Sequence, residues 1–82
     1  MTSDAVTEKV LTLLADATGT ARDRLHPGAS RADTPGWDSL GSLGFIALVE
    51  EEFHVSILTE EAMEIRSVKD MERLLLGKAA GG

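Results

Sequence analysis

Hydrophobic residues at the start of the chain recur at the spacing of an α-helix. They follow one another at intervals of four, three, one and three residues, which places them on one helical face. These residues are Val6, Val10, Leu13, Leu14 and Ala17. Ser3 or Asp4 can cap the start of this helix, and Thr18-Gly19 can end it. The pattern therefore predicts a first helix that begins near residue 3 and ends near residue 18.

Three further helices are predicted downstream. The second runs from about Asp38 to Phe53, and a short third helix begins near Thr59. The fourth begins at Ser67, because Ser67-Val68-Lys69-Asp70 is close to a capping box with Asp in place of the preferred Glu. Gly77 is expected to end the fourth helix, so that a single domain ordered over about residues 3–77 would be followed by a flexible tail, residues 78–82.

A long connection, residues 19–37, separates the first two helices. Gly and Pro residues interrupt any regular period in it, and a loop of this length in a small domain is usually functional or mobile. Leu25, its one large aliphatic residue, is expected to pin it to the core. Val55 and Ile57 alternate with polar residues over too few positions to make a sheet. The predicted fold is all-α: a small bundle of three main helices plus one short helix, with the long loop between the first and second.

The second helix carries more apolar residues than one buried face needs. At about 100° per residue, one stripe is suited to the core and consists of Phe45, Ile46, Val49 and Phe53. A second set points largely the other way, beside two carboxylates, and consists of Leu40, Leu43, Ala47, Glu50 and Glu51. This second set is either covered by the long loop or exposed as a partner-binding strip.

Two glycines, Gly41 and Gly44, lie in the first turns of the same helix. Each costs about 1 kcal/mol relative to Ala. They indicate either a weakly formed first turn or a surface lowered so that the backbone of another protein can approach.

Composition narrows the class of protein. The 82 residues include no Cys and only two His, His26 and His54, which excludes disulfides and thiolate sites and disfavours a His-rich metal site. The formal net charge is -6, and residues 32–65 hold eight acidic residues and no Lys or Arg. This balance disfavours nucleic acid and favours a basic protein surface as partner. The acidic stretch is either a solvated face that keeps a small protein soluble or a docking surface for basic patches on partners. No apolar run approaches a membrane span and no secretory leader opens the chain, so we expect a cytoplasmic protein without membrane contact. We also expect a monomer.

The residues Gly36-Trp37-Asp38-Ser39-Leu40 stand where the loop meets the acidic second helix. Together with Val49-Glu50-Glu51-Glu52-Phe53, the short acidic third helix and Ile65-Arg66-Ser67-Val68, they make the chain resemble an acyl carrier protein over nearly its whole length. The resemblance implies a carrier rather than an enzyme. It implies that the Ser39 hydroxyl receives 4'-phosphopantetheine from coenzyme A, and that the prosthetic thiol then holds acyl groups as thioesters.

The same resemblance implies partners and further site residues. Partners would be a phosphopantetheinyl transferase and acyl-loading and acyl-accepting enzymes with basic docking patches. Asp38 would cap the second helix and help to organise the magnesium-dependent transferase complex. Partner contacts would fall to Leu40, Leu43, Ala47, Glu50 and Glu51. The core stripe, with Leu13 and Leu74, could line an acyl cavity only if the helices part slightly, because native cores are close-packed.

Some features depart from the family pattern. Many fatty-acid carriers have acidic residues where this chain has Gly41 and Gly44, and the Gly-Gly-His/Asp-Ser-Leu form of peptidyl carriers is absent. These departures favour a free-standing carrier in polyketide or related specialised biosynthesis. Alternatives are an acidic helical interaction module without a prosthetic group, a sulfur carrier using the terminal Gly81-Gly82, which would need a β-rich fold, and a DNA-binding helix-turn-helix, which the acidity disfavours. Catalysis by Ser39 itself is disfavoured, because no adjacent base is expected.

Overall fold

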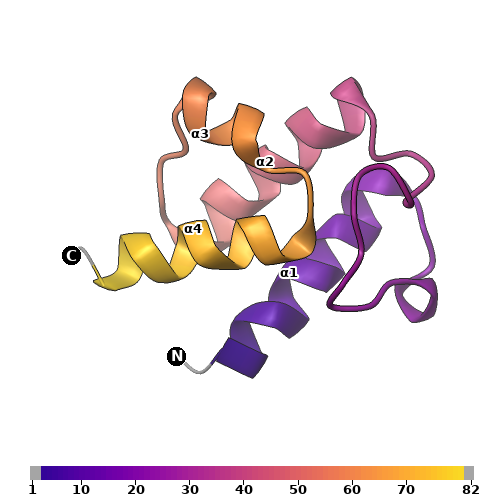
Figure 1. Ribbon diagram of the computed structural model, residues 1–82, viewed down its shortest axis with the longest axis horizontal. Coiled ribbons are helices and arrows are strands. Elements are labelled where there is room, and N and C mark those ends of the chain that lie inside the picture. The colour runs from indigo at the N-terminus through magenta and orange to yellow at the C-terminus, as the bar shows by residue number, and fades with distance from the viewer. Residues whose placement is uncertain (1–2, 81–82) are drawn as a thin grey trace.

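The computed structural model describes residues 3–80, which form an all-α fold (Figure 1). The elements are α1 (Ser3–Thr18), the 3-10 turn η1 (Arg22–Arg24), α2 (Ser39–Phe53), α3 (Thr59–Glu64) and α4 (Val68–Ala80). Among the described residues the only β-type pairing is an isolated antiparallel bridge between Ser30 and Ser67. The predicted bundle of three main helices and one short helix is confirmed, and only η1 had no counterpart in the hydrophobic pattern.

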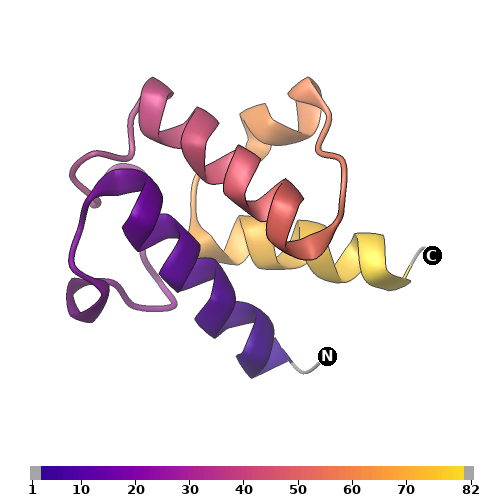
Figure 2. The same cartoon turned by 180° about the vertical axis from the view of Figure 1, so that it is seen from behind.

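Helix α1 packs against both α2 and α4 (Figure 2). The core takes residues from α1, α2 and α4 and from the segments between them. Its fully buried large side chains are Val10, Leu11, Leu14, Phe45, Val49, Val68 and Met71. The burial of Phe45 and Val49, with Ile46 and Phe53 half-buried against them, confirms the predicted core stripe of α2.

The long connection is fastened to the core at several points. Leu25 is buried as predicted, and Ala29 and Trp37 are buried with it. The Trp37 ring meets Phe45 edge-on, with ring centroids 5.5 Å apart at an interplanar angle of 82°. Because an edge-to-face pair adds to the burial of the rings themselves, the end of the loop is held against α2.

Helix α4 begins as predicted but ends later than predicted. The Ser67 hydroxyl accepts the N–H of Asp70 (3.1 Å), and an Asp70 carboxylate oxygen accepts the N–H of Arg66 (3.0 Å). Gly77 does not end the helix, which continues to Ala80. Lys78, beyond the glycine, bonds Glu61 of α3 at 2.9 Å, and this contact favours the extra turn. The remainder of the predicted flexible tail, residues 81–82, lies outside the described residues.

No helix in the stretch 3–80 has the length and apolar character needed to cross a bilayer.

Candidate functional site

Ser39 is the first residue of α2, and its side chain is exposed at the point where the long connection ends. A hydroxyl in this position is open to approach by another protein. Had Ser39 faced the core, no transferase could have reached it.

The start of α2 is a well-formed helix N-terminus. Asp38 has extended backbone angles, and its carboxylate accepts the N–H of Gly41 at 2.9 Å. The first intrahelical bond runs from the Ser42 N–H to the Asp38 carbonyl at 2.7 Å. The N–H groups of Ser39 and Leu40 precede that bond and take no part in the helical pattern. Since a helix N-terminus carries positive partial charge, this end of α2 suits an anion attached to Ser39.

Gly41 explains how the loop and the helix meet. It is buried, and a Cβ built on it would overlap the carbonyl oxygen of Gly36. Gly36 itself has a φ of 83° and lies against the backbone of Thr18. The close approach is therefore to this chain's own loop, and the hypothesis that Gly41 lowers an outer surface for a partner's backbone is wrong. A Cβ on Gly44 would meet only Ala17, at an ordinary 3.9 Å.

The second apolar set of α2 is exposed rather than covered by the loop. Leu40 is 77% exposed and Leu43 70%, and Ala47 is exposed with them. Three further exposed hydrophobic residues were not singled out from the sequence: Leu58, immediately before α3, at 59%, Met63 in α3 at 71% and Leu76 in α4 at 38%. No helical period marks Leu58 and Met63 in the sequence, because α3 has only six residues.

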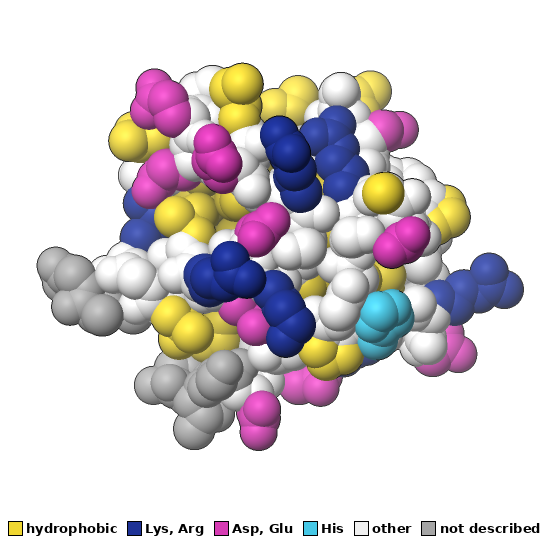
Figure 3. Space-filling model, in the orientation of Figure 1, with side chains coloured by type: hydrophobic (Ala, Val, Ile, Leu, Met, Phe, Trp, Pro, Cys, Tyr) yellow, Lys and Arg dark blue, Asp and Glu magenta, His cyan; other side chains and the backbone are white. Residues whose placement is uncertain are grey.

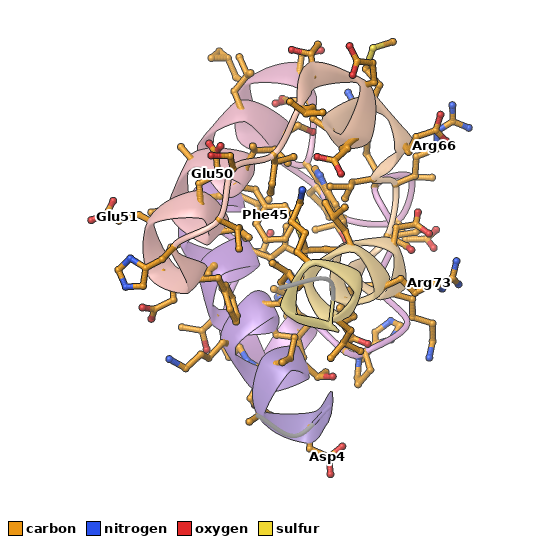
Figure 4. The ribbon with its side chains drawn as sticks, turned by 90° about the vertical axis from the view of Figure 1, so that its left-hand side faces the viewer. Asp4, Phe45, Glu50, Glu51, Arg66 and Arg73 are labelled. Carbon is orange, nitrogen blue, oxygen red and sulfur yellow. The ribbon has the colours of Figure 1, made fainter. Side chains whose placement is uncertain are left out.

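The two candidate carboxylates at the end of α2 differ in their surroundings. Glu50 is half-buried, and its carboxylate accepts the N–H of Ile57 at 3.0 Å, which ties the connection after α2 to the helix. Glu51 is exposed and points away from the bundle (Figure 4). Glu52 pairs with Lys9 at 3.7 Å. Glu51 is therefore the carboxylate best placed to meet a partner, while Glu50 also holds structure.

Glu61 links α3 to α4. Its carboxylate accepts the Leu58 N–H at 2.9 Å and pairs with Lys78 at 2.9 Å. The Leu58 backbone N–H, and next the Lys78 ammonium, hold the pKa of Glu61 below its usual value. The acidic third helix is thus linked to α4 by a charged contact.

Neither histidine is placed to activate Ser39. His26 is exposed in the loop, where its Nδ1 accepts the Gly28 N–H at 3.1 Å. His54 caps the opposite end of the 15-residue α2 in a left-handed conformation, with a φ of 55°. Within the described part of the chain, no group of three His, Cys, Asp or Glu residues could hold a metal ion.

The residues expected to extend an acyl cavity do not share one hollow. Leu13 borders a surface hollow with Leu48, Glu51, Glu52 and His54. Leu74 borders another, between α3 and α4, with Glu61 and Ile65 among its neighbours. Both leucines pack against the outside of the core.

Comparison with known proteins places the chain in a family. Residues 8–75 match the family described as "Phosphopantetheine attachment site". The chain is 35% identical over 80 residues to an acyl carrier protein of Thermosynechococcus vestitus, covering 98% of this chain and 99% of that protein. It is 38% identical over 66 residues to an acyl carrier protein of Solidesulfovibrio magneticus (80% and 85% covered) and 35% over 77 residues to one of Syntrophobacter fumaroxidans (93% and 95% covered). The chain belongs to the acyl carrier protein family, and it is a carrier rather than an enzyme.

Proposed function

We propose that Ser39 of this acyl carrier protein receives the 4'-phosphopantetheine group, and that the chain then delivers acyl groups to partner enzymes in polyketide or related specialised biosynthesis. The observation that carries the first part is the exposed Ser39 side chain at the first position of α2. At this residue a hydroxyl, an anion-favouring end of a 15-residue helix and an open approach coincide.

The residues at the start of α2 suit the attachment chemistry. The Ser39 oxygen forms the new bond to phosphorus while a phosphoanhydride bond of coenzyme A breaks, and the adenosine bisphosphate part leaves. The hydroxyl proton passes to the transferase or to water. The N–H groups of Ser39 and Leu40 favour the phosphodiester, and Asp38 keeps the turn in place by binding the Gly41 N–H. The attached group supplies a terminal thiol, which this chain, having no Cys, does not itself contain.

Mass spectrometry tests the attachment site. The protein is incubated with coenzyme A, Mg2+ and a broad-specificity phosphopantetheinyl transferase, and a mass gain of one phosphopantetheinyl group is expected. Ser39→Ala should abolish the gain, while Ser56→Ala, which removes another exposed hydroxyl, should not. A gain that persists in Ser39→Ala would assign the attachment elsewhere, and no gain with several transferases would refute the carrier role of this chain.

We assign partner docking to the exposed strip of α2, formed by Leu40, Leu43, Ala47 and Glu51. Exposed leucines beside a carboxylate combine apolar contact with steering toward a basic surface. Glu51→Lys should slow acyl loading by a basic partner, most strongly at low salt, because exposed charges are screened as salt rises. Asp16→Lys makes the same change of charge on the exposed side of α1 and is the matched control. Equal rates for the two variants would remove Glu51 from docking.

Glu50 belongs to the same strip only in part. Because its carboxylate binds the Ile57 N–H, Glu50→Lys should also lower stability, and its loading rate is interpretable only beside a thermal midpoint. A rate loss with an unchanged midpoint would show that Glu50 contacts partners directly.

The specialised role is supported by the first turn of α2, which carries no acidic residue. An enzyme whose basic patch is suited to an acidic first turn would therefore bind this helix less strongly. The holo protein should therefore be loaded more slowly by general fatty-acid enzymes than a fatty-acid carrier assayed beside it. Equal loading rates would contradict a dedicated partner set.

A further inference from the structure

A surface hollow lies directly beside the attachment serine. It has a volume of about 640 Å³ and adjoins Asp38, the residue before Ser39. Its lining is formed by Ser30, Arg31, Ala32, Trp37, Asp38 and Arg66. The hollow is thus lined by Trp37, by small side chains and by two arginines, close to the residue that bears the prosthetic group in the proposed function.

The backbone places the two arginines opposite each other. The Arg31 N–H donates to the Arg66 carbonyl at 2.8 Å, and the Val68 N–H donates to the Ala29 carbonyl at 3.0 Å. These bonds flank the antiparallel bridge between Ser30 and Ser67. Arg31 and Arg66 are therefore facing partners of one short antiparallel pair. Like charges placed directly opposite in such a pair are destabilising, so the arrangement has a cost that an anion between them would remove.

Among residues 3–80, no carboxylate forms an ion pair with either arginine. The neighbouring carboxylates have other partners: Asp33 accepts the Ser30 hydroxyl (2.7 Å), and Asp70 accepts the Arg66 N–H and pairs with Arg73 at 3.6 Å. Asp38 borders the hollow, but one of its oxygens is taken by the Gly41 N–H.

Arg66 of this hollow lies away from Glu51, the carboxylate of the docking strip. Figure 3 shows several Lys and Arg side chains on the face that α3 and α4 present, with Asp and Glu side chains between and around them. In Figure 4 Arg66 and Arg73 point outward on one side of the molecule, and Glu51 points outward on the other. A basic partner drawn to Glu51 would therefore not compete for Arg31 and Arg66.

We infer that this hollow seats the chain's own prosthetic arm, with Arg31 and Arg66 binding the phosphodiester and Trp37 and Ala32 contacting the apolar part that follows. The inference rests on the proposed attachment at Ser39. Three features favour the prosthetic arm as the occupant of the hollow. The arm is attached beside Asp38, its phosphodiester is opposite in charge to the two arginines, and the lining of the hollow is partly apolar. Between visits to enzymes, the arm lies against the protein rather than extending freely into solvent.

The test compares the apo and holo forms of three proteins. They are the wild type, the double variant Arg31→Gln/Arg66→Gln, and the control Arg24→Gln/Lys69→Gln, which also removes two exposed positive charges but none from the hollow. The mass of every preparation is measured first. No mass gain in the wild type would refute the attachment itself, so that failure is separate from failure of this inference.

Two readouts then apply to preparations of verified mass. Conversion from apo to holo should raise the thermal midpoint of the wild type and the control by about 2–4 °C at low salt, the shift expected for an exposed charge pair in a domain of this size. The rise should fall to less than half in the Arg31→Gln/Arg66→Gln variant. In wild-type amide NMR spectra, conversion should shift the signals of Arg31, Ala32 and Arg66. An equal rise in all three proteins, or shifts confined to residues 38–41, would overturn the inference.

Discussion

Replacement of Gly41 by Ala tests how the loop is fixed to the start of α2. The new methyl group would overlap the carbonyl oxygen of Gly36, a backbone atom that cannot turn aside as a side chain can. Gly44→Ala is the matched control, because its methyl group would reach only Ala17 at 3.9 Å. The two variants make the same chemical change three residues apart in one helix.

The structure gives the two variants opposite signs. In a helix Ala is favoured over Gly by about 1 kcal/mol, and Gly44→Ala should gain most of this. Gly41→Ala faces an overpacking cost of about 1–3 kcal/mol, toward the upper end because the obstacle is backbone. The expected result is a net loss of about 1–2 kcal/mol in the free energy of unfolding for Gly41→Ala. In a domain of this size each kcal/mol lowers the thermal midpoint by about 4–8 °C.

Urea unfolding followed by tryptophan fluorescence measures this difference. Trp37 is the only tryptophan, is 3% exposed and contacts Phe45, so its emission reports the junction of loop and core. Helical circular dichroism provides a second probe of the same transition. If Gly41→Ala proves as stable as Gly44→Ala, the loop is not held by this close approach and the explanation of Gly41 fails.

Two further predictions concern the ends of α2 and α3. Asp38→Ala should lower the free energy of unfolding by about 1 kcal/mol, because the N-cap to the Gly41 N–H is lost. Asp38→Asn still accepts that bond and should retain most of the stability in urea unfolding. An equal loss in both variants would assign the effect to charge instead. The pKa of Glu61 is held below its usual value, so the stability that its contacts contribute is present at neutral pH and lost as pH falls through the lowered pKa. Between about pH 6 and 3 the thermal midpoint of Glu61→Gln should therefore fall less than that of the wild type. Glu64→Gln removes an exposed carboxylate of the same helix and should follow the wild type. If the curves of Glu61→Gln and the wild type are parallel, the Glu61–Lys78 contact adds nothing to stability.

The sequence by itself determined the helices and the place of the candidate serine. Local periodicity and capping act over a few residues, which is why the starts of α2 and α4 and the buried stripe of Phe45 and Val49 followed from spacing and capping residues. The same local logic failed at Gly77. One glycine costs a helix only about 1 kcal/mol, and the contact of Lys78 with a residue 17 positions earlier favours the continued helix.

Tertiary structure decided what each exposed residue is free to do. Gly41 is explained by the approach of Gly36, and Glu50 is separated from Glu51 by its bond to the Ile57 N–H. Arg31 and Arg66 lie 35 positions apart in the sequence, and only the bridge at Ser30 and Ser67 brings them together. Contacts between distant segments depend on how the helices pack, and no local pattern of hydrophobic and polar residues encodes them.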